Sequence, residues 1–88
     1  MLTITEAARA YLLQTLNDLR LSEEFAFRLD RDGQSIMLQP DHERPGDTSV
    51  QHGGRTILLL DTGMSDRFSR DTLDLSGEEL MLTRQEHE

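Results

Sequence analysis

The sequence predicts a mainly β (α+β) domain, a small β-sandwich or flattened barrel of about six short strands with one N-terminal helix. Apolar residues at helical spacing occur only near the N-terminus, whereas short runs that alternate apolar and polar residues recur from residue 25 to residue 82. The run Ile57–Leu60, bounded by Gly53-Gly54 and Asp61, is typical of a strand covered on both faces. A chain of 88 residues has room for one domain, predicted at residues 1–84 with a frayed tail at 85–88.

The N-terminal segment is predicted to form a brief strand followed by the one long helix. Leu2 and Ile4 alternate with threonines, and Thr5 is a suitable N-cap because Glu6 behind it places a negative charge in the first turn. From Glu6 onward the apolar residues recur at intervals of four, four and three, at Ala8, Leu12, Leu16 and Leu19. We expect this face of the helix to pack on the core.

The next segment is predicted to form a hairpin and then an exposed loop. A strand is expected at residues 25–30, where every second residue is large and apolar: Phe25, Phe27 and Leu29. The Asp32-Gly33 pair is a hairpin signal because glycine adopts positive φ, and the alternation resumes at residues 36–38. The segment Gln39–Thr48 holds both prolines and very few apolar residues, so we expect it to be a loop.

A short helix and three further strands are predicted in the rest of the chain. The helix is expected near residues 65–70, around Phe68, with Ser65 and Asp66 as capping residues. The strands are expected at Thr48–His52, at residues 73–75 and at residues 80–82. In the second of these strands, Asp74 is expected to face outward.

Composition excludes several classes of function. The net charge of −8 and the pI near 4.7 disfavour nucleic acid and anionic membranes. All nine basic residues are arginine, so no lysine is present to form a Schiff base. The absence of cysteine excludes disulfides, thiolate nucleophiles and cysteine-bound clusters. No stretch approaches about 18 apolar residues and no secretory segment opens the chain, so we expect a soluble cytoplasmic protein.

Histidine and carboxylate side chains are the candidate metal ligands. His42 lies between Asp41 and Glu43, and imidazole with carboxylates suits a hard or borderline metal. The other histidines are His52 and, in the tail, His87. A flexible loop and a frayed tail do not preorganise a coordination geometry. We therefore expect these histidines to be ordinary exposed residues. We predict neither a metal nor a cofactor.

Catalysis is not predicted. The carboxylate pairs and serines that were weighed as catalytic groups are Asp61 with Asp66, Asp71 with Asp74, Ser65 and Ser69. No sequence pattern places a base beside a serine, and no glycine-rich pattern binds phosphate. Four consecutive aliphatic residues in so small a chain instead favour a protein partner or self-association, which would cover part of the apolar surface. The sequence does not indicate any small-molecule ligand.

Six segments occur in a distinctive order along the chain: Leu2–Ala8 entering a helix, Phe27–Leu29, Asp47–Val50, Gly53-Gly54, Ile57–Asp61 and Leu73-Asp74. Their order and spacing resemble the HesB-like family, the A-type (IscA-like) iron–sulfur cluster carriers, from Leu2 to about Arg84. The resemblance implies a compact β-sandwich-like fold with an N-terminal helix.

The same resemblance implies three cysteine ligands for an iron–sulfur cluster or iron. One would lie in the hairpin Asp32–Ser35, and a Cys-Gly-Cys pair would follow Arg84, where this sequence has Gln85–Glu88. Neither place holds a cysteine. The sequence therefore suggests a non-catalytic HesB-like protein, accessory to iron–sulfur cluster or iron handling through protein contacts. The alternative is a small acidic interaction or homodimerising module unrelated to iron–sulfur metabolism.

Overall fold

A computed structural model describes residues 2–32 and 35–84, in which seven strands form two sheets and two helices accompany them. The elements are β1 (Thr3–Ile4), α1 (Glu6–Asp18), β2 (Phe25–Asp32), β3 (Ser35–His42), β4 (Thr48–His52), β5 (Arg55–Leu60), α2 (Thr62–Arg67), β6 (Asp71–Ser76) and β7 (Glu79–Arg84). The predicted α+β fold is confirmed, with one strand more than expected. The turn predicted at Gly33 and the tail 85–88, with His87, lie outside the described residues.

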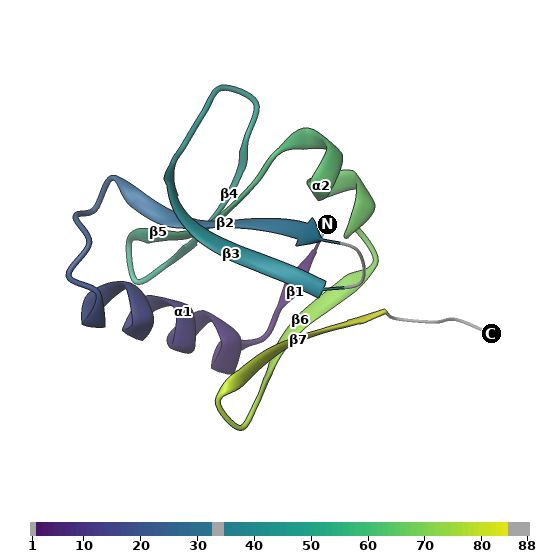
Figure 1. Cartoon of the computed structure of the whole chain (residues 1–88), viewed down its shortest axis with the longest axis horizontal. Helices are drawn as coiled ribbons and strands as arrows, with labels where there is room; N and C mark the ends of the chain where they lie inside the picture. Colours follow the sequence, from purple (N-terminus) through teal and green to yellow (C-terminus); the bar gives the residue numbers. More distant parts are fainter. Residues whose placement is uncertain (1, 33–34, 85–88) are drawn as a thin grey trace.

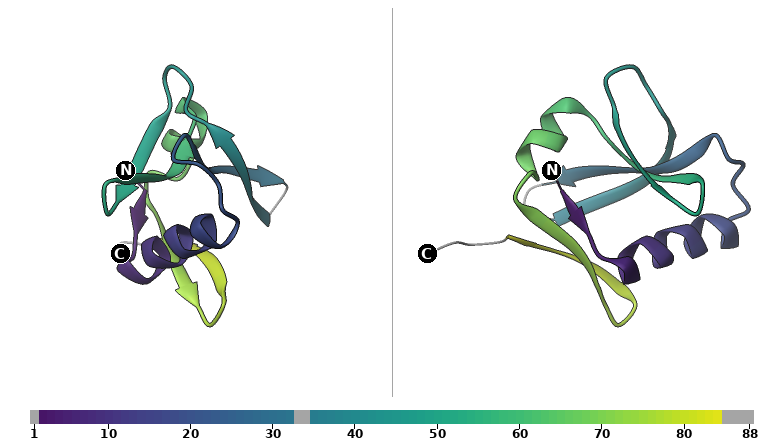
Figure 2. Two further views of the ribbon diagram at one scale, coloured as in Figure 1. Left: turned by 90° about the vertical axis from the view of Figure 1, so that its left-hand side faces the viewer. Right: turned by 180° about the vertical axis from the view of Figure 1, so that it is seen from behind.

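The larger sheet has the strand order β3-β2-β5-β4, and the smaller has the order β1-β6-β7. Helix α1 runs along one side of the larger sheet, and the β6–β7 hairpin lies beside the N-terminal end of this helix (Figures 1 and 2). The helix contacts β5 and β6 most extensively, and also β2 and β4. The main core therefore lies between α1 and the two sheets. Neither described helix is long and apolar enough to cross a bilayer.

Strand β5 is the interior strand that the aliphatic run predicted. It pairs in parallel with β2, where Phe27 faces Leu58, and antiparallel with β4. The turn into β5 is the predicted Gly53-Gly54, whose φ angles of +61° and +78° suit a two-residue hairpin. All four side chains of Ile57–Leu60 are buried. The expectation that this strand is covered on both faces is confirmed.

A β-bulge explains how most of the aliphatic run reaches one core. The β4–β5 register shifts between Val50 and Gln51, which leaves Ile57 without a partner residue on β4. A bulge interrupts the strict alternation of side chains between the two faces of a sheet. The main core accordingly contains three residues of the run: Ile57, Leu58 and Leu60. Leu59 is equally buried but lies on the other face of the sheet, called the outer face below.

Helix α1 follows its sequence signals except at its end. The Thr5 hydroxyl accepts a hydrogen bond from the Ala8 N–H at 3.2 Å, which confirms the predicted N-cap. The helix buries Ala8, Leu12 and Leu16. It ends at Asp18, and Leu19, which was expected on the core face, is 54% exposed. The chain leaves the helix at this point, because Arg20 adopts a left-handed φ of 57°.

Two arginines attach α1 to the rest of the molecule. Near its start, Arg9 donates hydrogen bonds to the carbonyl oxygens of Ile4 (3.2 Å) and Gln51 (3.1 Å). Beyond its end, Arg55 of β5 donates to the carbonyl oxygens of Leu21 and Ser22, both at 2.9 Å. Each guanidinium thus satisfies two backbone acceptors at once, a geometry that the fork of arginine permits.

The exposed loop predicted at Gln39–Thr48 is shorter than expected. Strand β3 continues to His42, and it includes Pro40, which faces Phe27 across the hairpin. Proline cannot donate to a sheet ladder, but β3 is an edge strand whose one neighbour among the described strands is β2, so a proline on its free side costs no ladder hydrogen bond. Only residues 43–47 connect β3 to β4.

The short helix begins earlier than predicted. Helix α2 is Thr62–Arg67, and its N-cap is Asp61, whose carboxylate accepts from the Met64 N–H at 2.8 Å. The capping role predicted for Ser65 and Asp66 is therefore wrong. Phe68 follows the last turn and is buried in the main core. Because Phe68 enters the core, the helix ends before it. Its N-cap is therefore Asp61, upstream of the predicted capping residues Ser65 and Asp66.

We expect Leu58→Ala to lower the free energy of unfolding by about 3 kcal/mol, because the fully buried side chain would leave a cavity that the two sheets cannot close. Urea denaturation followed by circular dichroism measures the change. The matched control is Leu19→Ala, at a position that is 54% exposed, which should alter stability very little. Equal losses in both variants would contradict the placement of β5.

Candidate functional site

The outer face of the larger sheet has a small apolar floor. Ala26 and Leu59 are 2% and 0% exposed, yet neither belongs to the main core. Arg28 pairs with Leu59 across the β2–β5 ladder, so it lies on this same face. The connection between β3 and β4 lies beside this floor, because its Asp47 bonds to Arg28.

Arg28 holds that connection in place. Its guanidinium donates to the two carboxylate oxygens of Asp47 at 3.0 and 2.6 Å, and to Asp41 Oδ2 at 2.7 Å. Asp47 also accepts from the Arg44 N–H at 2.7 Å. The side chains of Arg28 and Asp47 are only 14% and 3% exposed, so a bidentate ion pair lies largely out of water. The Arg28 network, defined as Arg28, Asp41, Arg44 and Asp47, closes the β3–β4 connection over the outer face.

The network also shifts the acid–base equilibria of its members. Hydrogen bonds from Arg28 lower the pKa of Asp47, although burial opposes this shift. The pKa of Asp41 is lowered by the hydrogen bond from Arg28 and then by the one from the His42 N–H. Hydrogen bonding to Asp47 raises the pKa of Arg28 in turn. Arg28, Asp41 and Asp47 therefore carry their charges at neutral pH.

The candidate metal ligands Asp41, His42 and Glu43 have other contacts or are exposed. Asp41 is occupied by Arg28 and by Arg44, whose Nη2 is 2.9 Å from the same carboxylate. The His42 ring packs against Phe25, with ring centroids 4.3 Å apart, and Glu43 is exposed. Among the described residues, no group of three or more His, Asp or Glu side chains is arranged to hold a metal ion. His52 lies apart from them, 3.9 Å from Glu6.

The groups weighed for catalysis, apart from the exposed Asp66, have structural contacts. Asp61 caps α2, and Asp74, exposed as predicted, accepts the hydroxyl of Thr5 at 2.8 Å. The hydroxyls of Ser65 and Thr48 are 3.3 Å apart. Asp71 is buried, and both it and Ser69 have interactions within the chain.

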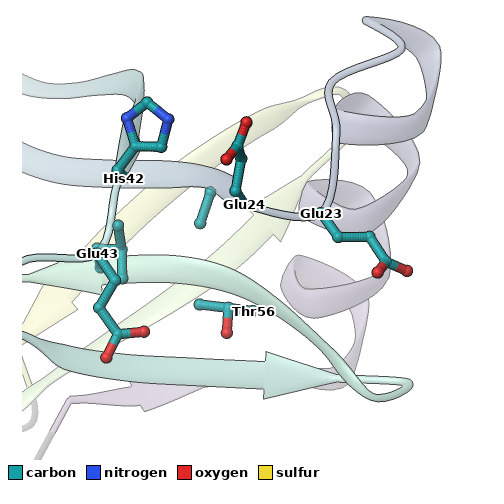
Figure 3. Close-up of a pocket in the computed structure, with 7 residues that line it drawn as sticks. Glu23, Glu24, His42, Glu43 and Thr56 are labelled. Atoms are coloured by element: carbon teal, nitrogen blue, oxygen red, sulfur yellow. The ribbon is translucent and has the colours of Figure 1, made fainter.

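A pocket of about 310 Å³ opens on the outer face beside the Arg28 network. Its lining residues are Glu23, Glu24, Ala26, His42, Glu43, Thr56 and Leu59. The carboxylates of Glu23, Glu24 and Glu43 point in different directions, and His42 points away from Glu43 (Figure 3). This outer pocket has an acidic rim, but its polar groups do not converge on one point.

A second hollow, of about 430 Å³, lies between the two sheets on the side of α1. It is lined by Tyr11, Leu12, Thr15, Phe27, Ile36, Leu38, Glu79 and Leu80. These residues come from α1, β2, β3 and β7, and all but three of them are aliphatic or phenylalanine. This inter-sheet groove is the larger and more apolar of the two hollows.

Sequence reasoning identified neither the Arg28 network nor the inter-sheet groove. Arg28 is a polar residue in an alternating strand, which is normally a solvated position, and its two carboxylate partners lie 13 and 19 residues away. The only signal was the number of acids near the predicted loop. The groove residues individually carry the pattern of core residues, so only the packing of the two sheets separates them from the core.

We expect Asp47→Asn to lower the free energy of unfolding at neutral pH by about 2 kcal/mol, since the largely buried Arg28 guanidinium loses its bidentate partner and keeps only Asp41 as an ionic partner. Because the folded protein lowers the pKa of Asp47, its contribution is present above the usual value of 3.8 and is lost as pH falls through the lower folded value. The difference between the variant and the parent should therefore shrink below pH 3.8. Urea denaturation across this range measures it.

The matched control for this prediction is Asp66→Asn, which removes the same charge from an exposed side chain. Asp66 should contribute little at any pH, so its curve should follow that of the parent. A loss in Asp66→Asn as large as in Asp47→Asn would show that net charge, and not the Arg28 network, determines the acid dependence.

Comparisons with known proteins give a likeness in structure and none in sequence. No family model matches the chain, and no curated protein matches it in sequence. Among four matching chains of solved structures is the crystal structure of Escherichia coli SufA, a protein involved in the biosynthesis of iron–sulfur clusters. The TM-score is 0.67 at 18% identity, and the match covers 96% of this chain and 83% of that chain. At this identity the likeness establishes the fold alone.

The fold invites the question whether these residues fit an iron–sulfur cluster. The sequence contains no cysteine, and the expected first ligand position, the hairpin Asp32–Ser35, offers carboxylate, amide and hydroxyl groups. Iron–sulfur clusters are held mainly by thiolates, so these hard donors do not fit one. The resemblance to the HesB-like family is thus confirmed at the level of architecture: this chain has the fold of SufA without any cysteine.

Proposed function

We propose that this protein is a non-catalytic HesB-like module that assists iron–sulfur cluster assembly or iron handling by binding other proteins, without carrying a cluster itself. The observation that carries the proposal is the likeness to SufA over 96% of the chain in a sequence with no cysteine. The same fold with a different donor set retains a surface for protein contacts and lacks the ligands for a cluster.

The described side chains support a binding role better than a catalytic one. The titratable groups with clearly shifted pKa values, Arg28, Asp41 and Asp47, bond to one another in the Arg28 network. Catalytic groups instead have shifted pKa values while remaining accessible to a substrate. The inter-sheet groove is apolar and has one carboxylate among its lining residues, which suits recognition of a protein segment.

A second candidate function is a protein-interaction or homodimerising module unrelated to iron–sulfur metabolism. Exposed methionines favour it: Met37 is 38% exposed and Met81 is 47% exposed. They lie on β3 and β7, each of which is one of the two terminal strands of its sheet. Methionine is an adaptable contact residue, and an edge strand offers unpaired backbone groups.

Anaerobic reconstitution with ferrous iron and sulfide tests the absence of cluster binding. We expect the desalted protein to show no stable visible absorbance, because carboxylates and imidazoles do not retain a cluster against dilution. E. coli SufA, treated in parallel, is the control for the procedure. A stable brown product with this protein would overturn the argument from missing thiolates.

Affinity capture from a cytoplasmic extract separates the two candidate functions. With the full chain as bait, we expect proteins of iron–sulfur cluster assembly to be enriched over a bait of equal size and similar net charge, which controls for acidic binding in general. Reproducible recovery of an unrelated protein would favour the second candidate. Light scattering that shows a stable dimer, with no captured protein, would favour the homodimer and contradict the first.

A further inference from the structure

We propose that the inter-sheet groove binds an extended segment of a partner protein whose apolar side chains alternate and are flanked by lysine or arginine. This inference rests on the proposed function as a protein-binding module and specifies both the surface and the chemistry of the partner. Three features carry it: the apolar lining of the groove, the strand edges that form its walls, and the charge around it.

The lining combines a buried floor with half-exposed walls. Leu12 and Phe27 are 1% and 6% exposed and belong to the main core. Ile36, Leu38 and Leu80 pack against that core but remain partly open to solvent. A hollow of about 430 Å³ with such walls keeps a contiguous apolar surface in water, and covering it with apolar side chains is favourable.

The walls come from strands at the edges of both sheets. Strand β3 is terminal in the order β3-β2-β5-β4 and supplies Ile36 and Leu38, while β7 is terminal in the order β1-β6-β7 and supplies Glu79 and Leu80. Within the described residues, neither strand has a neighbour on its outer side. An extended segment can therefore form main-chain hydrogen bonds along one edge while every second side chain enters the groove.

Charge selects a basic segment. Glu79 is the charged residue among the groove lining, exposed Glu78 precedes it, and the whole chain carries −8. Arg31, which faces Ile36 across the β2–β3 hairpin, already has an interaction within the chain. A second copy of the protein would bring its own charge of −8 to the contact, which opposes association. A lysine or arginine beside the apolar residues is attracted instead.

Selection of a phage-displayed library of random peptides on the immobilised protein is the first test. We expect enriched peptides to alternate apolar residues and to contain lysine or arginine. In nuclear magnetic resonance titrations these peptides should shift amide signals of β3, of β7 and of α1 near Tyr11 and Thr15. Enrichment of acidic peptides, shifts confined to β4 or to the outer pocket, or the failure of any peptide to be enriched would each overturn the inference.

Matched variants then test the charge and the apolar wall separately. Glu79→Gln should weaken binding of an enriched peptide about threefold, while Glu78→Gln, outside the lining, changes it less. Leu38→Ser should weaken it about tenfold, while Met37→Ser, one residue away and outside the lining, has little effect. Thermal melting shows whether each variant is folded. If Leu38→Ser unfolds, the comparison of Glu79→Gln with Glu78→Gln and the amide signals shifted by the peptide still test whether the groove binds it.

The groove and the proposed function fail in different ways. If the parent captures cluster-assembly proteins and the folded Leu38→Ser variant captures them equally well, the groove is wrong and the proposed function stands. If basic apolar peptides bind the groove and no cluster-assembly protein is captured, the groove stands and the proposed function is wrong.

Discussion

Burial of β5 on both of its faces is the constraint on which the rest of the structure depends. On one side, Ile57, Leu58 and Leu60 require a cover, and α1 with the smaller sheet provides it. On the other side, Leu59 is buried although the described chain offers, besides α1, only the short helix α2. On this side, Arg28 binds the charged connection between β3 and β4 through Asp47. Apolar residues make up only 35% of this small domain, so few of them remain to cover the second face of the larger sheet.

The Arg28 network attaches a polar connection to the outer face of the larger sheet. Asp47 brings a carboxylate into a nearly buried position, which is unfavourable unless its oxygens are bonded, and Arg28 bonds both of them. This attachment needs no disulfide, since the sequence contains no cysteine. Identity with SufA of only 18% is consistent with this, because buried shape and strand order can persist while surface chemistry changes. Any binding role then depends on surfaces such as the inter-sheet groove.

Local signals predicted most of the fold, and tertiary context decided the rest. The Thr5 cap, the spacing of Ala8, Leu12 and Leu16 along α1 and the four aliphatics of β5 each specify their element within a few residues, so local patterns predict them correctly. Pro40 was assigned to a loop because its tolerance depends on β3 lying at an edge, which no local pattern reveals. The Arg28 network and the groove join residues far apart in sequence, and their individual residue types have ordinary explanations. The candidate site was therefore largely unpredictable from sequence, whereas the scaffold was not.

The parallel pairing of β1 with β6 joins opposite ends of the chain. Thr3 faces Thr72, and the Thr5 N–H donates to the Leu73 carbonyl oxygen at 3.0 Å, so the entrance to α1 is completed by residues made much later. During synthesis on the ribosome, α1 and the larger sheet emerge before β6, so β1 cannot pair with β6 until later. Contacts of such long sequence separation slow folding, so the nascent chain exposes its unfinished core until β6 has left the exit tunnel.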